Sequence, residues 1–219
     1  MARAGRAGDG PNMVAADVER RYARLLARTF RARMPYGMLA FLAVSGATAL
    51  PELSMHPELA TTFLIVLALQ AQIWLLAHAS MRRPSLSYAR AVTISLLTML
   101  GMVILITGYH VVASGDAEVL LLSLSCVTVG AVVLFPWNAQ AQLVVASASV
   151  LAYAIGLAAG IHATTPSSLH LVGLATIAAL TVGSVILIDQ YRRRFFRLAA
   201  RRAARHVWQR YATMPSPAG

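Results

Sequence analysis

Every basic side chain other than histidine is an arginine, and the nineteen arginines fall into three blocks separated by long apolar stretches. The blocks cover residues 3–33, 82–90 and 192–210. The gaps between them, 34–81 and 91–191, are 48 and 101 residues long and contain no arginine. Because 58% of the chain is hydrophobic and the mean hydropathy is +0.65, these gaps are too apolar for a soluble domain of this length and predict helices in lipid.

Six segments have the composition of membrane spans, each of which needs roughly 20 apolar residues. Proline, glycine, serine and asparagine punctuate the intervals between them, as is typical of turns. A β-barrel is disfavoured, because its strands alternate apolar and polar residues over about ten positions. We therefore predict an all-α, polytopic membrane protein with six transmembrane helices, at residues 35–50, 58–79, 87–109, 118–136, 140–161 and 169–189.

The arginine blocks also predict the orientation, because Lys and Arg near membrane ends are retained in the cytoplasm. Six spans place all nineteen arginines on one side and leave residues 51–57, 110–117 and 162–168, which contain none, on the other. Five spans would put an eight-arginine end outside. We predict a multi-pass protein of the bacterial cytoplasmic (inner) membrane with both termini in the cytoplasm, in contact with the bilayer and its anionic inner-leaflet lipids.

The segments outside the 34–190 membrane domain divide by composition. We expect disorder at 1–12 and 212–219, a basic amphipathic helix at 13–33, and an arginine-rich exit helix at 191–211 that continues the last span, since no helix breaker precedes Pro215. Apolar residues recur on one face of the 13–33 helix, at Val14, Val18, Tyr22, Leu25, Leu26 and Phe30. This helix either lies on the inner leaflet or serves only as a topology signal.

Catalytic and cofactor motifs do not occur in the sequence: it has no Walker loop, GxSxG elbow, HExxH pair, dinucleotide fingerprint or cysteine cluster. The lone Cys126 is interpreted as a packing residue. An isoelectric point near 11.2 could indicate nucleic-acid binding, but the arginines flank membrane spans. We predict no enzymatic activity, no cofactor and no nucleic-acid partner.

Polar residues inside the spans are hydroxyls and amides, with no acid or base near a span centre, as ion-coupled transporters would need. We interpret the hydroxyls as hydrogen-bonding groups between helices. Gln70 and Gln72 are candidates for a polar path. Four histidines fall at or near the outer face, at His56, His110, His162 and His170. Imidazole binds Zn and Cu, so these four form a candidate metal site, against the alternative of solvated loop histidines.

Small residues recur every fourth position in the last two spans and include Gly156, Gly160 and Gly183. Such stripes let helix backbones approach closely. They indicate either packing within the bundle or a homodimer interface, and the sequence leaves both open.

A Pro136-Trp137 turn between the fourth and fifth spans, short loops, and an exit that passes from Asp189 into consecutive arginines resemble the six-helix membrane domains that precede bacterial class III adenylate cyclases, diguanylate cyclases and sensor histidine kinases. The resemblance covers about residues 15–205, and no output domain follows within the 219 residues. It implies a sensor or regulatory module that signals through its sixth helix to a cytoplasmic partner, with the transmitting residues Asp189, Arg192, Arg193 and Phe195.

A second functional class remains open. The chain could be a small transporter or channel subunit for an uncharged solute, with Gln70 and Gln72 along the path. The lack of a titratable residue at mid-membrane and of an inverted repeat argues against it. An integral membrane enzyme has the least support, because no catalytic pair shares a depth.

Overall fold

The computed structural model describes residues 10–83, 86–113 and 115–212, and these form an all-α bundle, which confirms the predicted fold class. Their one β-type pairing is an isolated bridge between Asp116 and His162. The elements are α1 (Gly10–Met55), the 3-10 helix η1 (Pro57–Leu59), α2 (Ala60–Met81), α3 (Tyr88–Val112), α4 (Ala117–Leu134), α5 (Ala139–Ala158) and α6 (Ser167–Ala212).

Five of these helical segments are long and apolar enough to cross a membrane: Pro57–Met81, Tyr88–Val112, Ala117–Leu134, Ala139–Ala158 and Ser167–Ala199. Large apolar side chains cover their outer surface, among them Leu76, Ile104 and Leu180, which are 66–70% exposed. An apolar surface this extensive matches a lipid solvent rather than water. The prediction of a helical membrane protein is confirmed at this level.

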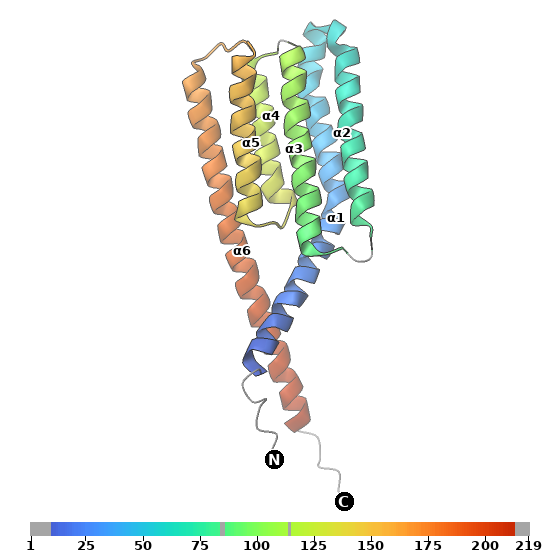
Figure 1. Ribbon diagram of the computed structural model, residues 1–219, viewed down its shortest axis with the longest axis vertical. Helices are drawn as coiled ribbons and strands as arrows, with labels where there is room; N and C mark the ends of the chain where they lie inside the picture. The colour runs from blue at the N-terminus through green and yellow to red at the C-terminus, as the bar shows by residue number, and fades with distance from the viewer. Residues whose placement is uncertain (1–9, 84–85, 114, 213–219) are drawn as a thin grey trace, which may run out of the picture.

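The helices pack side by side as one bundle from which α1 and α6 extend at the same end (Figure 1). The α2–α3 and α4–α5 connections also lie at that end, which we call the arginine end because the described arginines gather there. The α1–α2, α3–α4 and α5–α6 connections lie at the opposite, far end. In the most apolar window of α3 and of α5, 44% of residues are buried, against 11% in α2 and 17% in α6, so α3 and α5 are the inner helices.

The helix α1 differs from the two separate segments expected at 13–33 and 35–50, because it runs as one 46-residue helix through both. It also continues past Pro51 to Met55, whereas a loop was expected from 51. Pro35 lies between the two parts of α1, and proline cannot donate the hydrogen bond that helix geometry requires. The part of α1 before the bundle slants away from the bundle axis (Figure 1), as expected of a helix that bends near a proline.

The expectations of disorder fall mostly on residues outside the described ones. Within these, residues 10–12 belong to α1 and residue 212 is the last of α6. The helix α6 is continuous from Ser167, as the lack of a breaker before Pro215 predicts.

Side-chain caps and one glycine set the helix ends that fix the short connections. The Ser87 hydroxyl accepts a hydrogen bond from the Arg90 N–H at 3.3 Å and begins α3. The Asn138 side chain accepts from the Ala141 N–H at 3.0 Å and begins α5. Gly160 has φ +93° at the end of α5, a conformation that side chains with a Cβ rarely adopt.

An aromatic cluster fills the core toward the arginine end. Phe135 stacks on Phe30 of α1 with ring centroids 5.7 Å apart, and lies 6.3 Å from Trp74 of α2 and 5.1 Å from Trp137. All four side chains are at most 1% exposed. The aromatic residues around the Pro-Trp turn are thus buried in the core, where α1, α2 and the α4–α5 connection meet.

Two arginines of α1 hold the ends of neighbouring helices. Arg31 donates to the carbonyl oxygens of Met81 at 2.9 Å and Arg83 at 2.7 Å, where α2 ends. Arg33 donates to the carbonyl oxygen of Val133 at 3.1 Å, in the last turn of α4. The last carbonyls of a helix lack intrahelical donors and carry partial negative charge, so cations stabilise them. These arginines therefore hold α1 against the ends of α2 and α4.

Candidate functional site

The extended ends of α1 and α6 meet in a group of charged contacts that we call the clasp: Glu19 and Tyr22 of α1 with Asp189, Arg193 and Arg197 of α6. Arg197 donates to Glu19 at 3.0 Å, and Arg193 lies 3.7 Å from the other oxygen of Glu19. Arg193 also donates to Asp189 at 2.9 Å, and Asp189 accepts from the Tyr22 hydroxyl at 3.4 Å. The clasp joins the first and last helices where they cross outside the bundle (Figure 1).

Tyr22 is the buried centre of the clasp, at 5% exposure. Its ring centroid lies 5.2 Å from that of Phe196, and the Arg193 guanidinium carbon lies 5.7 Å from the Tyr22 ring, within cation–π range. Burial, and secondarily the Asp189 carboxylate, raise the pKa of the Tyr22 hydroxyl to about 12. The hydroxyl therefore stays protonated and remains a donor to Asp189 at neutral pH.

Two of the four predicted transmitting residues, Asp189 and Arg193, lie in the clasp. Phe195 is 76% exposed on the outer surface of α6, and Arg192 is half-buried and outside the contacts described above. The sequence reasoning missed Glu19, Tyr22 and Arg197. Tyr22 belonged to the apolar face noted on the 13–33 helix; its ring packs on Phe196 of α6, whereas Phe30 of the same face packs on Tyr88 and Phe135. An acid in a basic helix, as at Glu19, was a usable signal for pairing with another arginine block.

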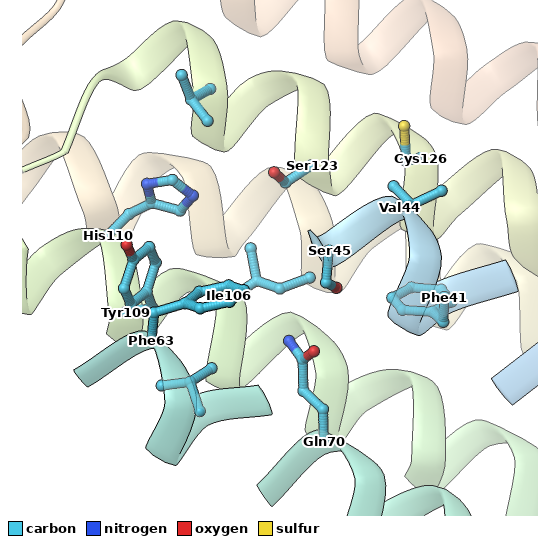
Figure 2. A pocket seen from close by; sticks show the side chains of 12 residues that line it. Phe41, Val44, Ser45, Phe63, Gln70, Ile106, Tyr109, His110, Ser123 and Cys126 are labelled. Atoms are coloured by element: carbon cyan, nitrogen blue, oxygen red, sulfur yellow. The ribbon is translucent and has the colours of Figure 1, made fainter. Parts of the chain in front are cut away.

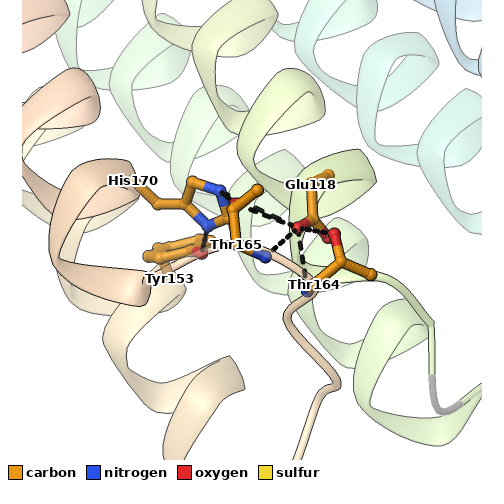
Figure 3. Close-up of polar contacts among 5 residues, drawn as sticks. All are labelled: Glu118, Tyr153, Thr164, Thr165 and His170. Carbon is orange, nitrogen blue, oxygen red and sulfur yellow. Dashed lines mark hydrogen bonds and ion pairs between the residues drawn. The ribbon is translucent and has the colours of Figure 1, made fainter.

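A polar network at the far end ties α4, α5 and α6 together (Figure 3). One oxygen of Glu118 accepts from the backbone N–H groups of Thr164 and Thr165 at 3.0 and 3.1 Å and from their hydroxyls at 2.6 and 3.2 Å. His170 of α6 hydrogen-bonds to the Thr165 hydroxyl and, at 2.5 Å, to the Tyr153 hydroxyl of α5. The start of α6 is thereby fixed to its neighbours.

The four histidines of the predicted metal site lie in different surroundings. His56 is exposed and contacts Glu58 at 3.1 Å, whereas His162 lies in the α5–α6 connection. His110 is buried in α3, and His170 is engaged in the far-end network. Among the described residues, no three His, Cys, Asp or Glu side chains are grouped to hold a metal ion. The geometry thus offers no support for the metal site.

The two glutamines of the predicted path separate in the structure. Gln70 is buried at 3% exposure and lines a cavity of about 40 Å³ between α1, α2, α3 and α4 (Figure 2). His110 and Cys126 line the same cavity. Gln72 is exposed on the outside of α2. A continuous path through both amides is therefore not formed.

Interhelical hydrogen bonding, expected of the span hydroxyls, occurs between α4 and α5. Thr128 donates to Ser149 at 3.0 Å, Gln142 donates to the Thr128 carbonyl oxygen at 3.0 Å, and Gln142 accepts from the Trp137 indole at 3.1 Å. Thr98, Thr176 and Ser184 instead donate to carbonyl oxygens four residues earlier in their own helices.

The small-residue stripes have three different roles. A Cβ built on Gly156 would lie 2.8 Å from a Leu120 methyl and 2.9 Å from an Ile161 methyl, so this glycine permits close packing on α4. Gly160 ends α5. A Cβ added to Gly183 would meet no other atom of the described residues within 4 Å. Internal packing accounts for Gly156 alone.

Searches against protein-family models, curated proteins and solved structures found no match to this chain.

Proposed function

We propose that this protein is a membrane signalling module with six spans and both termini in the cytoplasm. The first span in this proposal, additional to the five apolar segments named above, is the part of α1 that packs in the bundle beside α2 (Figure 1). With six crossings, all three arginine blocks lie on one side of the membrane. The positive-inside rule assigns that side to the cytoplasm. Localisation to a bacterial inner membrane is part of the same proposal.

The observation that carries the signalling role is the clasp. It joins residues of α1 and α6 that are 167 to 178 positions apart in the sequence, where both helices leave the membrane domain. Its contacts are mostly half-exposed ion pairs, and the side chains of Glu19, Arg193 and Arg197 are 44–58% exposed. Exposed pairs contribute only about 0.2–1 kcal/mol each. A clasp of this strength can open and close at a modest free-energy cost, as a regulated contact requires.

The continuous helix α6 connects the far end of the bundle to the arginine end. Its first turns are fixed by the far-end network through His170, and its exit carries Asp189, Arg193 and Arg197. A signal that changes the position of α6 in the bundle would change the clasp and the arginine-rich surface offered to a cytoplasmic partner. The resemblance to sensor membrane domains points in the same direction.

The test is a distance measurement between spin labels on the two extensions, at Arg28→Cys in α1 and Arg194→Cys in α6, with Cys126→Ser, in lipid nanodiscs. Both labelled positions are exposed. We expect two distance populations, with Glu19→Gln moving the ratio toward the longer distance. Glu58→Gln, at the far end, is the matched control and leaves the ratio unchanged. One narrow distance that Glu19→Gln does not alter would overturn the proposal.

The topology is tested separately by labelling intact cells with a membrane-impermeant maleimide in the Cys126→Ser background. His162→Cys is expected to react in intact cells, and Phe195→Cys only after lysis. The reverse pattern would contradict the orientation.

A channel or transporter for an uncharged solute is the second candidate, favoured by buried Gln70 at the cavity. Solute flux into proteoliposomes that is lost in Gln70→Leu would support it.

A further inference from the structure

The cavity between α1, α2, α3 and α4 contains two buried polar atoms that nothing else in the described protein satisfies. Gln70 and His110 are each 3% exposed. Neither the Gln70 side-chain oxygen nor the His110 Nδ1 atom has a hydrogen-bond partner among the residues that the structure describes. An unsatisfied buried polar atom is costly, and such atoms are usually met by water or a ligand.

Both atoms belong to one cavity, and their chemistry defines what it accepts. The Gln70 oxygen is an acceptor, and the His110 Nδ1 atom is a donor when it carries the ring proton. The lining has no Asp, Glu or Arg, and apolar side chains such as Phe41, Phe63 and Ile106 form much of the wall (Figure 2). An ion is therefore disfavoured, and a neutral molecule with a hydrogen-bond donor is complementary.

The volume limits the size of that molecule. The cavity of about 40 Å³ is about three times the roughly 10–15 Å³ that one water molecule needs on the same measure. We propose that it is a binding site for the hydroxyl or amide head group of a small, uncharged molecule, such as a short-chain alcohol. The head-group hydroxyl donates a hydrogen bond to the Gln70 oxygen and accepts one from the His110 Nδ1–H, and the aromatic and aliphatic wall contacts its carbon atoms.

This site would also supply the ligand step of the signalling function proposed above, but its existence does not depend on that function. It borders α1, whose extension carries half of the clasp, because Phe41 belongs to both α1 and the cavity wall. Binding is measured here without any signalling readout, so failure of the site and failure of the clasp are distinguishable.

Cys126 gives the chain its own reporter. It is the only cysteine in the sequence, is half-buried, and lines the cavity. The experiment measures the rate at which methyl methanethiosulfonate modifies Cys126 in the full chain in nanodiscs, with ethanol as the probe. Acetonitrile, which has the same number of non-hydrogen atoms and no hydroxyl donor, is the control molecule.

We expect saturating ethanol to slow modification at least threefold, with a half-maximal concentration on the order of 1 mM, the best that a ligand of three non-hydrogen atoms reaches. Gln70→Leu and His110→Leu should raise that concentration at least tenfold. Gln72→Leu, the same substitution at an exposed site on the same helix, should leave it unchanged. Should Gln70→Leu not fold, Gln70→Met keeps the side-chain length and tests the same acceptor.

Nitrogen NMR of labelled histidine gives a direct second measurement, in which ethanol should shift the His110 Nδ1 resonance at concentrations where acetonitrile, which cannot donate to Gln70, does not. Equal protection of Cys126 by both solvents would overturn the proposal, since it would indicate apolar partitioning alone. Full protection by ethanol in Gln70→Leu and His110→Leu would also overturn it. So would a cavity that holds ordered water only, seen as an absence of any ethanol effect on either measurement.

Discussion

The Glu19 carboxylate accepts a hydrogen bond from Arg197 at 3.0 Å, although 178 positions separate the two residues in the chain. This contact closes the polypeptide into a loop whose ends are the first and last helices. A change in the bundle that separates α1 from α6 at their crossing lengthens this distance. The contact is therefore both a structural tie and a measurable indicator of bundle geometry.

The coupling between Glu19 and Arg197 should be small and dependent on salt. We expect a double-mutant cycle of Glu19→Gln and Arg197→Gln to give about 0.2–1 kcal/mol in the free energy of unfolding in mixed micelles, because the pair is half-exposed. Raising the salt concentration should reduce the value. Glu58→Gln with Arg197→Gln is the control cycle and should give no coupling. A coupling above about 2 kcal/mol would contradict a weak, regulated clasp.

Tyr22 should titrate late and weaken the fold at high pH. Its folded pKa of about 12 lies above the ordinary value of 10.0, mainly through burial and then through Asp189. The neutral hydroxyl is therefore favoured by folding, so this contribution is complete below pH 10 and is lost as the pH rises toward 12. The absorbance difference at about 295 nm between wild type and Tyr22→Phe measures the transition. Asp189→Asn should move it toward lower pH, and a wild-type midpoint at the ordinary value would contradict the burial of Tyr22.

Gly156→Ala should destabilise the protein, whereas Gly183→Ala should not. The new Cβ at 156 would lie 2.8 and 2.9 Å from methyl groups of Leu120 and Ile161, which have to move. Overpacking of this kind costs about 1–3 kcal/mol. The Cβ at 183 would meet nothing within 4 Å in the described structure. Thermal unfolding in detergent compares the two. Equal effects would show that close packing of α5 on α4 is absent.

Removing the Glu118 carboxylate should loosen the α5–α6 connection. Its Oε1 atom accepts four hydrogen bonds from Thr164 and Thr165. Because these donors are exposed and can bind water instead, we expect Glu118→Ala to cost about 1–2 kcal/mol. Limited proteolysis of residues 159–166 in intact vesicles should become faster. Glu58→Ala, which removes only an exposed contact to His56, is the control. No change in cleavage by Glu118→Ala would show that the network does not hold the loop.

The bounds of the helices were predicted well from the sequence where a segment is apolar along its whole length. The predicted spans at 58–79 and 87–109 agree with the observed segments Pro57–Met81 and Tyr88–Val112 within three residues at each end. A long apolar segment in lipid forms a helix, because a helix makes all of its backbone hydrogen bonds within the segment. A proline, by contrast, did not by itself end a helix. Pro35 and Pro51 both lie inside α1, although proline removes a backbone hydrogen-bond donor.

The candidate site was predictable only in part, because it depends on which helix faces meet. Asp189 and Arg193 stood out as charges at a membrane exit, but their partners on α1 are fixed by a crossing that no local pattern encodes. Gln70 and Gln72 are two positions apart and point to different sides of one helix. Only the packing of α1 and α3 against α2 decided that Gln70 is the buried one.

The two longest helices differ mechanically even though each has 46 residues, about 69 Å at 1.5 Å per residue. The described stretch of α6 contains no proline and acts as a stiff strut, whereas Pro35 gives α1 a joint close to where it enters the bundle. If the strut slides along its axis, the hinged partner has two responses: it swings about Pro35 with the clasp intact, or it stays in place and the clasp parts. Under the proposed signalling function, the strength of the side-chain contacts in the clasp relative to the stiffness of the helix at Pro35 decides whether a movement of α6 is passed to α1 or separates the two helices.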